Sequence, residues 1–165
     1  MPKKEIPKKE TPKKEKKEIQ SVLIVAKQNA VGIKAAKKVD NLLKNRVKEI
    51  HYDSSTALRL RARGASIRKF RGDLVITLGG DGTYLWTAHK TDIPVLPIKL
   101  EGQGFLCTTN MKQFTDNLDR ILKKDYQIIE RMRLSVRKVS QGKIKKYIEI
   151  IHPSQYPLSL YEIAF

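Results

Sequence analysis

A short apolar run that leads directly into three glycines is the feature that most limits how this chain can fold. Residues 73–78 read Asp-Leu-Val-Ile-Thr-Leu, and residues 79–83 follow as Gly-Gly-Asp-Gly-Thr. An apolar run without alternation is typical of a strand that is buried on both faces, as in a parallel sheet. The glycines allow positive φ angles and a tight turn, so the sequence predicts a strand, a turn and then a helix.

Strands and helices are predicted to alternate along the first two thirds of the chain. Apolar runs at residues 21–26 and 93–98 predict two more buried strands, and weak alternation at residues 47–52 predicts another. Between these strands, apolar residues recur at helical spacing. This alternation predicts an α/β fold, a Rossmann-like parallel sheet with helices on both faces. The predicted helical stretches are residues 33–47, 54–70, 84–90 and 108–122, the last with Thr108, Thr109 or Asn110 as N-cap.

The second helical stretch carries basic residues beside an apolar stripe of Leu58, Ala62 and Ala65. The basic cluster could steer polyanions such as ATP or polyphosphate toward the glycine loop. A solvated helix face is the favoured alternative, because 34 Lys and Arg stand against 17 Asp and Glu in the whole chain, a net charge of +17. The cluster consists of Arg59, Arg61, Arg63, Arg68, Lys69 and Arg71.

The pattern changes near residue 126, where helical spacing ends. Residues 128–139, 143–151 and 158–165 look like strands, and they predict the first antiparallel strands of a β-rich second domain. The chain stops inside the last of these apolar strands, so we expect the second domain to be incomplete. The predicted division is a disordered tail at 1–19, an α/β nucleotide-binding domain at 20–125 and an incomplete β-rich domain at 126–165.

The tail repeats Pro-Lys-Lys-Glu with few apolar side chains, so little burial offsets the entropy lost on ordering. A Lys-rich arm could contact nucleic acid, but the interleaved glutamates dilute its charge and favour a solubilising extension. The sequence contains no motif that combines aromatic and basic residues in the way of RNA-recognition proteins.

The glycine loop is the predicted site of chemistry. Ligands of open α/β sheets bind beyond the carboxyl ends of the strands, and glycines let backbone N–H groups approach a phosphate there. Asp81 would repel a phosphate, so its presence favours another role: to accept a proton from a substrate hydroxyl or to meet a cation. In the alternative interpretation, Asp81 only N-caps the following helix. Neither Gly-Lys-Ser/Thr nor Gly-x-Gly-x-x-Gly is present at the loop.

At this loop the sequence resembles the NAD kinase family, whose hallmark is Gly-Gly-Asp-Gly-Thr. Diacylglycerol and sphingosine kinases share the motif, and phosphofructokinases have a close variant. Two further matches favour NAD kinases: Pro-Val-Leu at residues 94–96 followed by Gly-Phe-Leu at 104–106, and the segment 126–134 with its Arg-x-x-Leu element. The resemblance extends over about residues 21–165.

The resemblance implies that the protein phosphorylates the adenosine-ribose 2′-hydroxyl of NAD to give NADP. It implies ATP or polyphosphate as donor, together with a divalent cation such as Mg²⁺. Asp81 would be the general base. Further residues would shape the phosphate and dinucleotide site, namely Gly79, Gly80, Gly82, Thr83, Leu85, Phe105 and Glu162, beside Tyr161.

The sequence also departs from the family pattern. Tyr161 replaces the asparagine of the family's Asn-Glu/Asp pair, and Trp86 stands at an often basic position. By this resemblance we expect the 165-residue sequence to lack the family's C-terminal β domain, which supplies much of the substrate pocket and of the subunit contacts. We therefore expect the 165-residue chain to be weak or inactive alone. We also expect a homo-oligomer or a separate C-terminal partner domain.

Other residues limit the remaining function classes. No apolar stretch is long enough to cross a bilayer and no secretory signal is present, so no membrane partner is expected. The single cysteine, Cys107, predicts a packed thiol in a reducing, cytoplasmic setting. The three histidines share no metal-ligand spacing, so no metal site is expected, and Trp86 is predicted to pack against the sheet. The alternatives to an NAD kinase are a lipid kinase of the same loop type and a non-catalytic basic nucleotide- or nucleic-acid-binding module.

Overall fold

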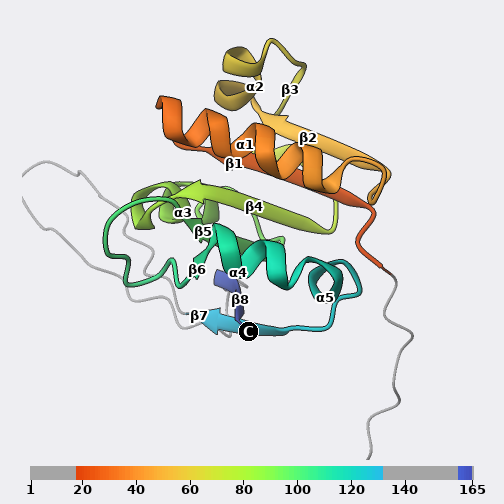
Figure 1. Ribbon diagram of the computed structural model, residues 1–165, viewed down its shortest axis with the longest axis vertical. Helices are drawn as coiled ribbons and strands as arrows, with labels where there is room; N and C mark the ends of the chain where they lie inside the picture. The colour runs from red at the N-terminus through yellow and green to blue at the C-terminus, as the bar shows by residue number, and fades with distance from the viewer. Residues whose placement is uncertain (1–17, 132–159, 165) are drawn as a thin grey trace, which may run out of the picture.

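The computed structural model describes residues 18–131 and, for the backbone alone, residues 160–164. The strands are β1 Ser21–Ala26, β2 Glu49–Asp53, β3 Gly64–Ala65, β4 Leu74–Gly79, β5 Val95–Lys99, β6 Thr109–Asn110, β7 Gln127–Arg131 and β8 Leu160–Ala164. In this part of the chain they form one eight-stranded sheet in the order β3-β2-β1-β4-β5-β8-β7, with β6 paired to β5 (Figure 1). All pairs are parallel except β7 with β8.

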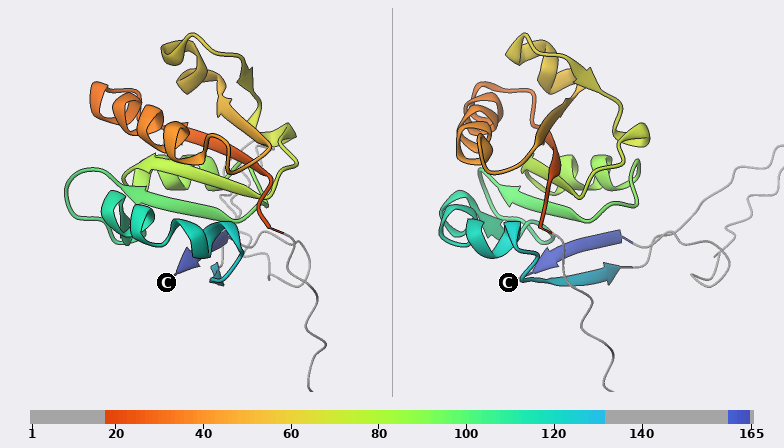
Figure 2. Two further views of the ribbon diagram at one scale, coloured as in Figure 1. Left: turned by 45° about the vertical axis from the view of Figure 1, so that its right-hand side comes forward. Right: turned by 90° about the vertical axis from the view of Figure 1, so that its right-hand side faces the viewer.

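Helices cover both faces of this sheet (Figure 2). The helices are α1 Ala30–Leu43, α2 Ser54–Leu60, α3 Asp81–Ala88, α4 Met111–Asp116 and α5 Leu118–Leu122, with a 3-10 turn, η1, at Ile67–Lys69. Helices α1, α4 and α5 pack on one face, against side chains such as Val22 and Ile24. Helix α3 and η1 pack on the other face, against Leu23 and Val25. The predicted α/β fold with a buried parallel sheet is therefore confirmed.

Capping residues fix where several helices begin. The Asn29 side chain accepts a hydrogen bond from the Gly32 N–H at 2.8 Å and caps α1. Asn110, one of the predicted N-caps, forms a capping box with Gln113 at the start of α4. The predicted helix over residues 108–122 is divided in two at Asn117, where the backbone leaves the helical region.

The predicted helix over residues 54–70 is wrong beyond α2. This helix ends at Leu60, and Arg61 takes a left-handed conformation with φ 55°. The chain then forms β3 and η1, because Ile67 and Phe70 must turn into the core on the α3 face. The predicted apolar stripe fails for the same reason: Leu58 is 79% exposed, and α2 buries Thr56 and Ala57 instead.

The carboxylate of Asp73 ties the start of β1 to the end of the α5 region. It accepts hydrogen bonds from the backbone N–H groups of Gln20 and Ser21, at 2.8 and 3.1 Å, and from the Lys124 ammonium at 2.8 Å. Burial alone would raise the pKa of Asp73, but the Lys124 charge and the backbone donors outweigh it and lower the pKa. Asp73 therefore remains ionised at neutral pH and aligns the first strand.

The strands after residue 126 join the edge of the same sheet. Strand β8 runs parallel to β5, and β7 pairs with it in the antiparallel sense that the sequence predicts. The predicted strand at 143–151 and most of the tail lie outside the described residues. The domain boundary at residue 126 stays a prediction.

No helix in residues 18–131 is long and apolar enough to cross a membrane.

Shortening a core side chain on the α1 face should destabilise the protein far more than shortening an exposed one on α2. Phe114 is fully buried, so Phe114→Ala should lower the free energy of unfolding by about 3–5 kcal/mol. Leu58→Ala is the matched control and should change it by less than about 0.5 kcal/mol. Urea denaturation followed by circular dichroism measures both. A comparable loss in Leu58→Ala would contradict the placement of α2.

Candidate active site

The glycine loop lies where the sheet changes its winding direction. From β1 the chain crosses by α1 to β2 on one side, and from β4 it crosses by α3 to β5 on the other. Helices α1 and α3 consequently lie on opposite faces of the sheet (Figure 2). Ligands of open α/β sheets bind at such a switch point.

A cavity of about 320 Å³ occupies this switch point. Residues 25–28 at the end of β1 form one wall, and Gly82 and Thr83 of α3 form another. Trp86, Asp53 and Ser55 complete the lining. The cavity therefore brings the second half of the glycine motif beside the loop that follows β1.

The glycines of the motif are needed for space and not for unusual backbone angles. A Cβ on Gly79 would lie 2.4 Å from Oγ1 of Thr83, so the strand end and the helix start can touch only without a side chain there. A Cβ on Gly80 or Gly82 would meet no atom within 4 Å. None of the three takes the positive φ that glycine allows, since among the glycines described only Gly102 has one, at 68°. The open space above Gly80 and Gly82 is available to a ligand.

Asp81 is the first residue of α3, and its carboxylate reaches across to the loop after β5. Oδ2 accepts a hydrogen bond from the Phe105 N–H at 2.8 Å, and Oδ1 accepts from Leu106 and Cys107 at 3.1 and 3.0 Å. The carboxylate does not cap α3, because the N-cap position is Gly80 and no side-chain bond caps this helix. The alternative interpretation of Asp81 as an N-cap is therefore wrong.

Gly104 allows this contact. A Cβ there would lie 3.1 Å from Oδ1 of Asp81 and 3.1 Å from the Cys107 carbonyl oxygen. The Gly-Phe-Leu segment therefore passes close enough to give its backbone donors to the carboxylate. Sequence reasoning missed this role of residues 105–107, although the glycine before Phe-Leu was a signal for close approach.

The backbone donors keep the Asp81 carboxylate charged. The Cys107 N–H lowers the pKa of Asp81 most, burial opposes it, and the Phe105 and Leu106 N–H groups add to the decrease. The Cys107 side chain is a further, smaller donor to the same carboxylate. Of the backbone bonds, Oδ1 accepts two and Oδ2 accepts one.

The other predicted site residues fall into two groups. Leu85 and Phe105 are near the loop and are 41% and 94% exposed, and their role in binding a dinucleotide stays a prediction. Tyr161 and Glu162 lie on β8, and the register sets Glu162 opposite Val95, at the amino end of β5. Gly79 is paired with Lys99, at the carboxyl end of β5. Glu162 is thus at the opposite end of β5 from the glycine loop.

The structure also tests the predictions for Cys107 and Trp86. The Cys107 thiol is buried in the core, as predicted, and forms no disulfide. Trp86 does not pack against the sheet: it is 46% exposed, and the Lys90 ammonium lies 3.0 Å from the centroid of its ring. Lys90 follows the end of α3 and stands four residues after Trp86, which is the sequence signal for their contact.

Within residues 18–131, no group of three His, Cys, Asp or Glu side chains could hold a metal ion. The Asp81 carboxylate, already engaged with three backbone donors, is not accompanied by a second acid that would complete a cage. The described residues therefore do not fit a protein-held divalent cation.

The fold and the loop define an α/β unit with helices on both faces of a parallel sheet and an acid at its switch point. A family model described as the ATP-NAD kinase N-terminal domain matches residues 7–126, which is more than half of the chain. The chain belongs to the NAD kinase family.

Individual relatives agree with this assignment. An NAD kinase of Thermoplasma acidophilum is 38% identical over 88 residues, 53% of this chain and 32% of the relative. An NAD kinase of Thermococcus sibiricus is 30% identical over 120 residues, 69% of this chain and 44% of the relative. The crystal structure of yeast NADH kinase complexed with NADH superposes with a TM-score of 0.63 at 19% identity, and it covers 74% of this chain and 45% of that one. The chain thus spans less than half the length of these relatives.

The bonds to Asp81 should disappear when its charge is removed. We expect Asp81→Asn to speed amide hydrogen exchange of Phe105, Leu106 and Cys107, because an amide has fewer acceptor positions than a carboxylate. In the unmodified chain, the lowered pKa of Asp81 should keep these amides protected until the pH falls below about 3.9, the ordinary value for aspartate. Amide NMR over a pH series measures both effects. Loss of protection already near pH 5 would contradict the geometry.

Proposed function

We propose that this protein phosphorylates the adenosine-ribose 2′-hydroxyl of NAD to give NADP, with ATP or polyphosphate as phosphoryl donor. The observation that carries the proposal is the Asp81 carboxylate, held ionised by three backbone donors on the residue that precedes Gly82 and Thr83 of the switch-point cavity. Membership of the NAD kinase family supports the substrate class.

In this proposal, Asp81 positions the hydroxyl and accepts its proton. Oδ2, which accepts a single backbone hydrogen bond, would receive the O–H of the sugar, while the loop amides keep the carboxylate from rotating away. A carboxylate with a lowered pKa is a weak base, but phosphoryl transfer passes through a loose transition state in which positioning matters most. Asp81 therefore contributes mainly by holding the oxygen in line with the phosphorus.

The start of α3 would receive the transferred phosphate. Its first-turn N–H groups carry partial positive charge, and no side chain stands above Gly80 or Gly82. Leu85 and Phe105 are exposed apolar surfaces that would cover the dinucleotide. The part of Tyr161 and Glu162 in holding the dinucleotide remains a prediction.

The cation and the assembly belong to the proposal as well. Since the described residues form no metal cage, Mg²⁺ would enter bound to the donor phosphates and not to a preformed protein site. Association with a second copy or with a β-rich partner domain would supply further contacts to the dinucleotide. A reducing compartment such as the cytoplasm suits the buried thiol of Cys107, which forms no disulfide.

Removal of the Asp81 charge should remove the activity. We expect Asp81→Asn to lower the rate of NADP formation by at least about 100-fold, the range of a lost general base. The assay incubates the purified chain with NAD, Mg²⁺ and either ATP or polyphosphate, and an enzymatic cycling reaction detects small amounts of NADP.

Asp116→Asn is the matched control, since Asp116 is an exposed aspartate on α4, away from the loop. Its rate should equal that of the unmodified chain. NADP formation at an equal rate in Asp81→Asn would refute the role of Asp81. No NADP from the unmodified chain with either donor would refute the proposed activity for this chain alone.

A further inference from the structure

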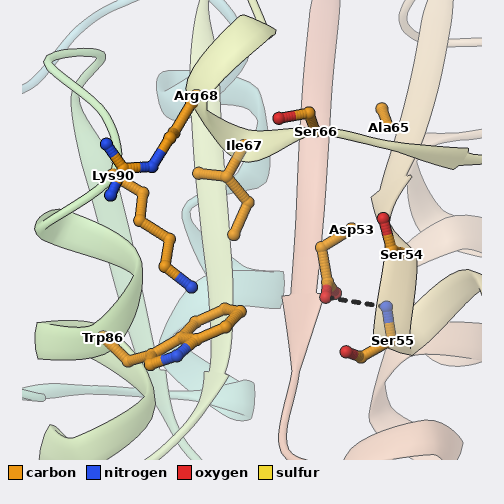
Figure 3. A pocket seen from close by; sticks show the side chains of 9 residues that line it. All are labelled: Asp53, Ser54, Ser55, Ala65, Ser66, Ile67, Arg68, Trp86 and Lys90. Atoms are coloured by element: carbon orange, nitrogen blue, oxygen red, sulfur yellow. Dashed lines mark hydrogen bonds between the residues drawn. The ribbon is translucent and has the colours of Figure 1, made fainter.

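A second cavity, of about 310 Å³, adjoins the switch-point cavity on the side of β3 and η1 (Figure 3). Hydroxyl groups and cations line much of it. Ser54 and Ser55 come from the first turn of α2, Arg68 from η1, and Lys90 follows the end of α3. This combination of hydroxyl and cationic groups suits a phosphate-bearing ligand.

The two cations of this cavity are within electrostatic reach of each other. Burial lowers the pKa of Lys90, and the charge of Arg68 lowers it further, against a smaller opposite effect of Asp53. Neither Arg68 nor Lys90 forms a salt bridge within the described residues. The Lys90 ammonium instead lies over the Trp86 ring (Figure 3). An anion bound between Arg68 and Lys90 would relieve their repulsion.

The one acid in the cavity lining is already engaged. Asp53 is 3% exposed, and its two carboxylate oxygens accept hydrogen bonds from the backbone N–H groups of Ser55 and Thr56, at 3.0 and 3.3 Å. Asp53 therefore serves as the N-cap of α2. Its oxygens are directed to the helix, so the cavity keeps a net positive lining.

The two cavities form one continuous groove. Asp53, Ser55 and Trp86 line both of them. The groove begins at Arg68 and Lys90, passes Trp86 and reaches Gly82 and Thr83, which adjoin Asp81. A linear ligand that occupied the whole groove would have one end at the glycine loop.

We propose that this groove binds a chain of three or more linked phosphates, the phosphoryl donor of the reaction above. The terminal phosphate lies at Gly82 and Thr83, and the more distant phosphates lie between Arg68 and Lys90. Lys90 leaves the Trp86 ring to contact them. The role of this ligand as phosphoryl donor rests on the proposed function. Its binding to the groove can be tested without measuring NADP formation.

The chain contains a single tryptophan, so its fluorescence reports on this groove alone. Titration of the full chain with inorganic tripolyphosphate should give a saturable change in Trp86 emission, because the ammonium above the ring moves. ATP is titrated in parallel. Equal affinities would mean that the groove recognises the phosphates alone, and tighter binding of ATP would mean that it also contacts the nucleoside; both outcomes support the proposal.

Arg68→Gln and Lys90→Gln should each weaken tripolyphosphate binding by about tenfold or more, as expected for a lost charge-assisted contact. Lys90→Gln also alters the Trp86 emission of the unbound protein, so isothermal titration calorimetry measures the affinity of this variant. Arg63→Gln is the matched control, since Arg63 is an exposed arginine nearby that does not line the groove. Its affinity should stay within about twofold of the unmodified chain, because exposed charges contribute little at physiological salt.

Three results would overturn the proposal. One is the absence of a saturable response to tripolyphosphate and ATP. Another is an equal loss of affinity in Arg63→Gln, which would mean attraction by overall charge. The third is competition by NAD for the tripolyphosphate site, which would assign the groove to the acceptor. Tripolyphosphate binding without NADP formation would refute the proposed activity and leave the anion groove in place.

Discussion

The contact on which the site depends is made by one carboxylate and three consecutive backbone amides. Asp81 opens α3, and its acceptors Oδ1 and Oδ2 are met by residues 105–107, which follow β5. The strand end, the helix start and the Gly-Phe-Leu loop are thereby joined at one point. Charge-assisted hydrogen bonds of this kind are stronger than neutral ones. The direction of the acid is consequently fixed before any ligand arrives.

This contact also joins two segments that are far apart in the sequence, residues 79–83 and 104–107. The glycines bring the chain close at residues 79–83, and Gly104 does the same on the facing loop. Neither segment is sufficient by itself, because the acid belongs to one and the amides belong to the other. The switch point between β1 and β4 then follows from the order of the strands, since α1 and α3 cover opposite faces.

The elements that could be predicted from the sequence are those whose burial is visible in a short stretch of residues. Strands β1, β4 and β5 are apolar runs buried on both faces, so their positions could be predicted from the sequence. The glycine loop could be predicted with them, because it directly follows β4. The partners of Asp81 were not, because they lie 24 to 26 positions further along the chain. The end of α2 at Leu60 was missed for a similar reason: the core contacts of Ile67 and Phe70 override the helical spacing of the preceding residues. Trp86 was misplaced because the rule that aromatic residues are buried ignores a lysine one turn away.

The early end of α2 has one more consequence, which concerns how the positive charge is distributed. With Arg61 in a left-handed turn, Arg59, Arg63 and Arg68 belong to a helix, a loop and a 3-10 turn instead of a single helical row. Such a scattered arrangement produces a diffuse attractive potential over this edge of the molecule, with a range of about 8 Å at physiological ionic strength. It can enrich many kinds of anion near the surface, but it offers no regular spacing by which one could be distinguished from another. Selection among these anions therefore has to occur in the groove between Arg68 and Gly82, where the spacing of the lining groups and not the total charge determines which anion binds.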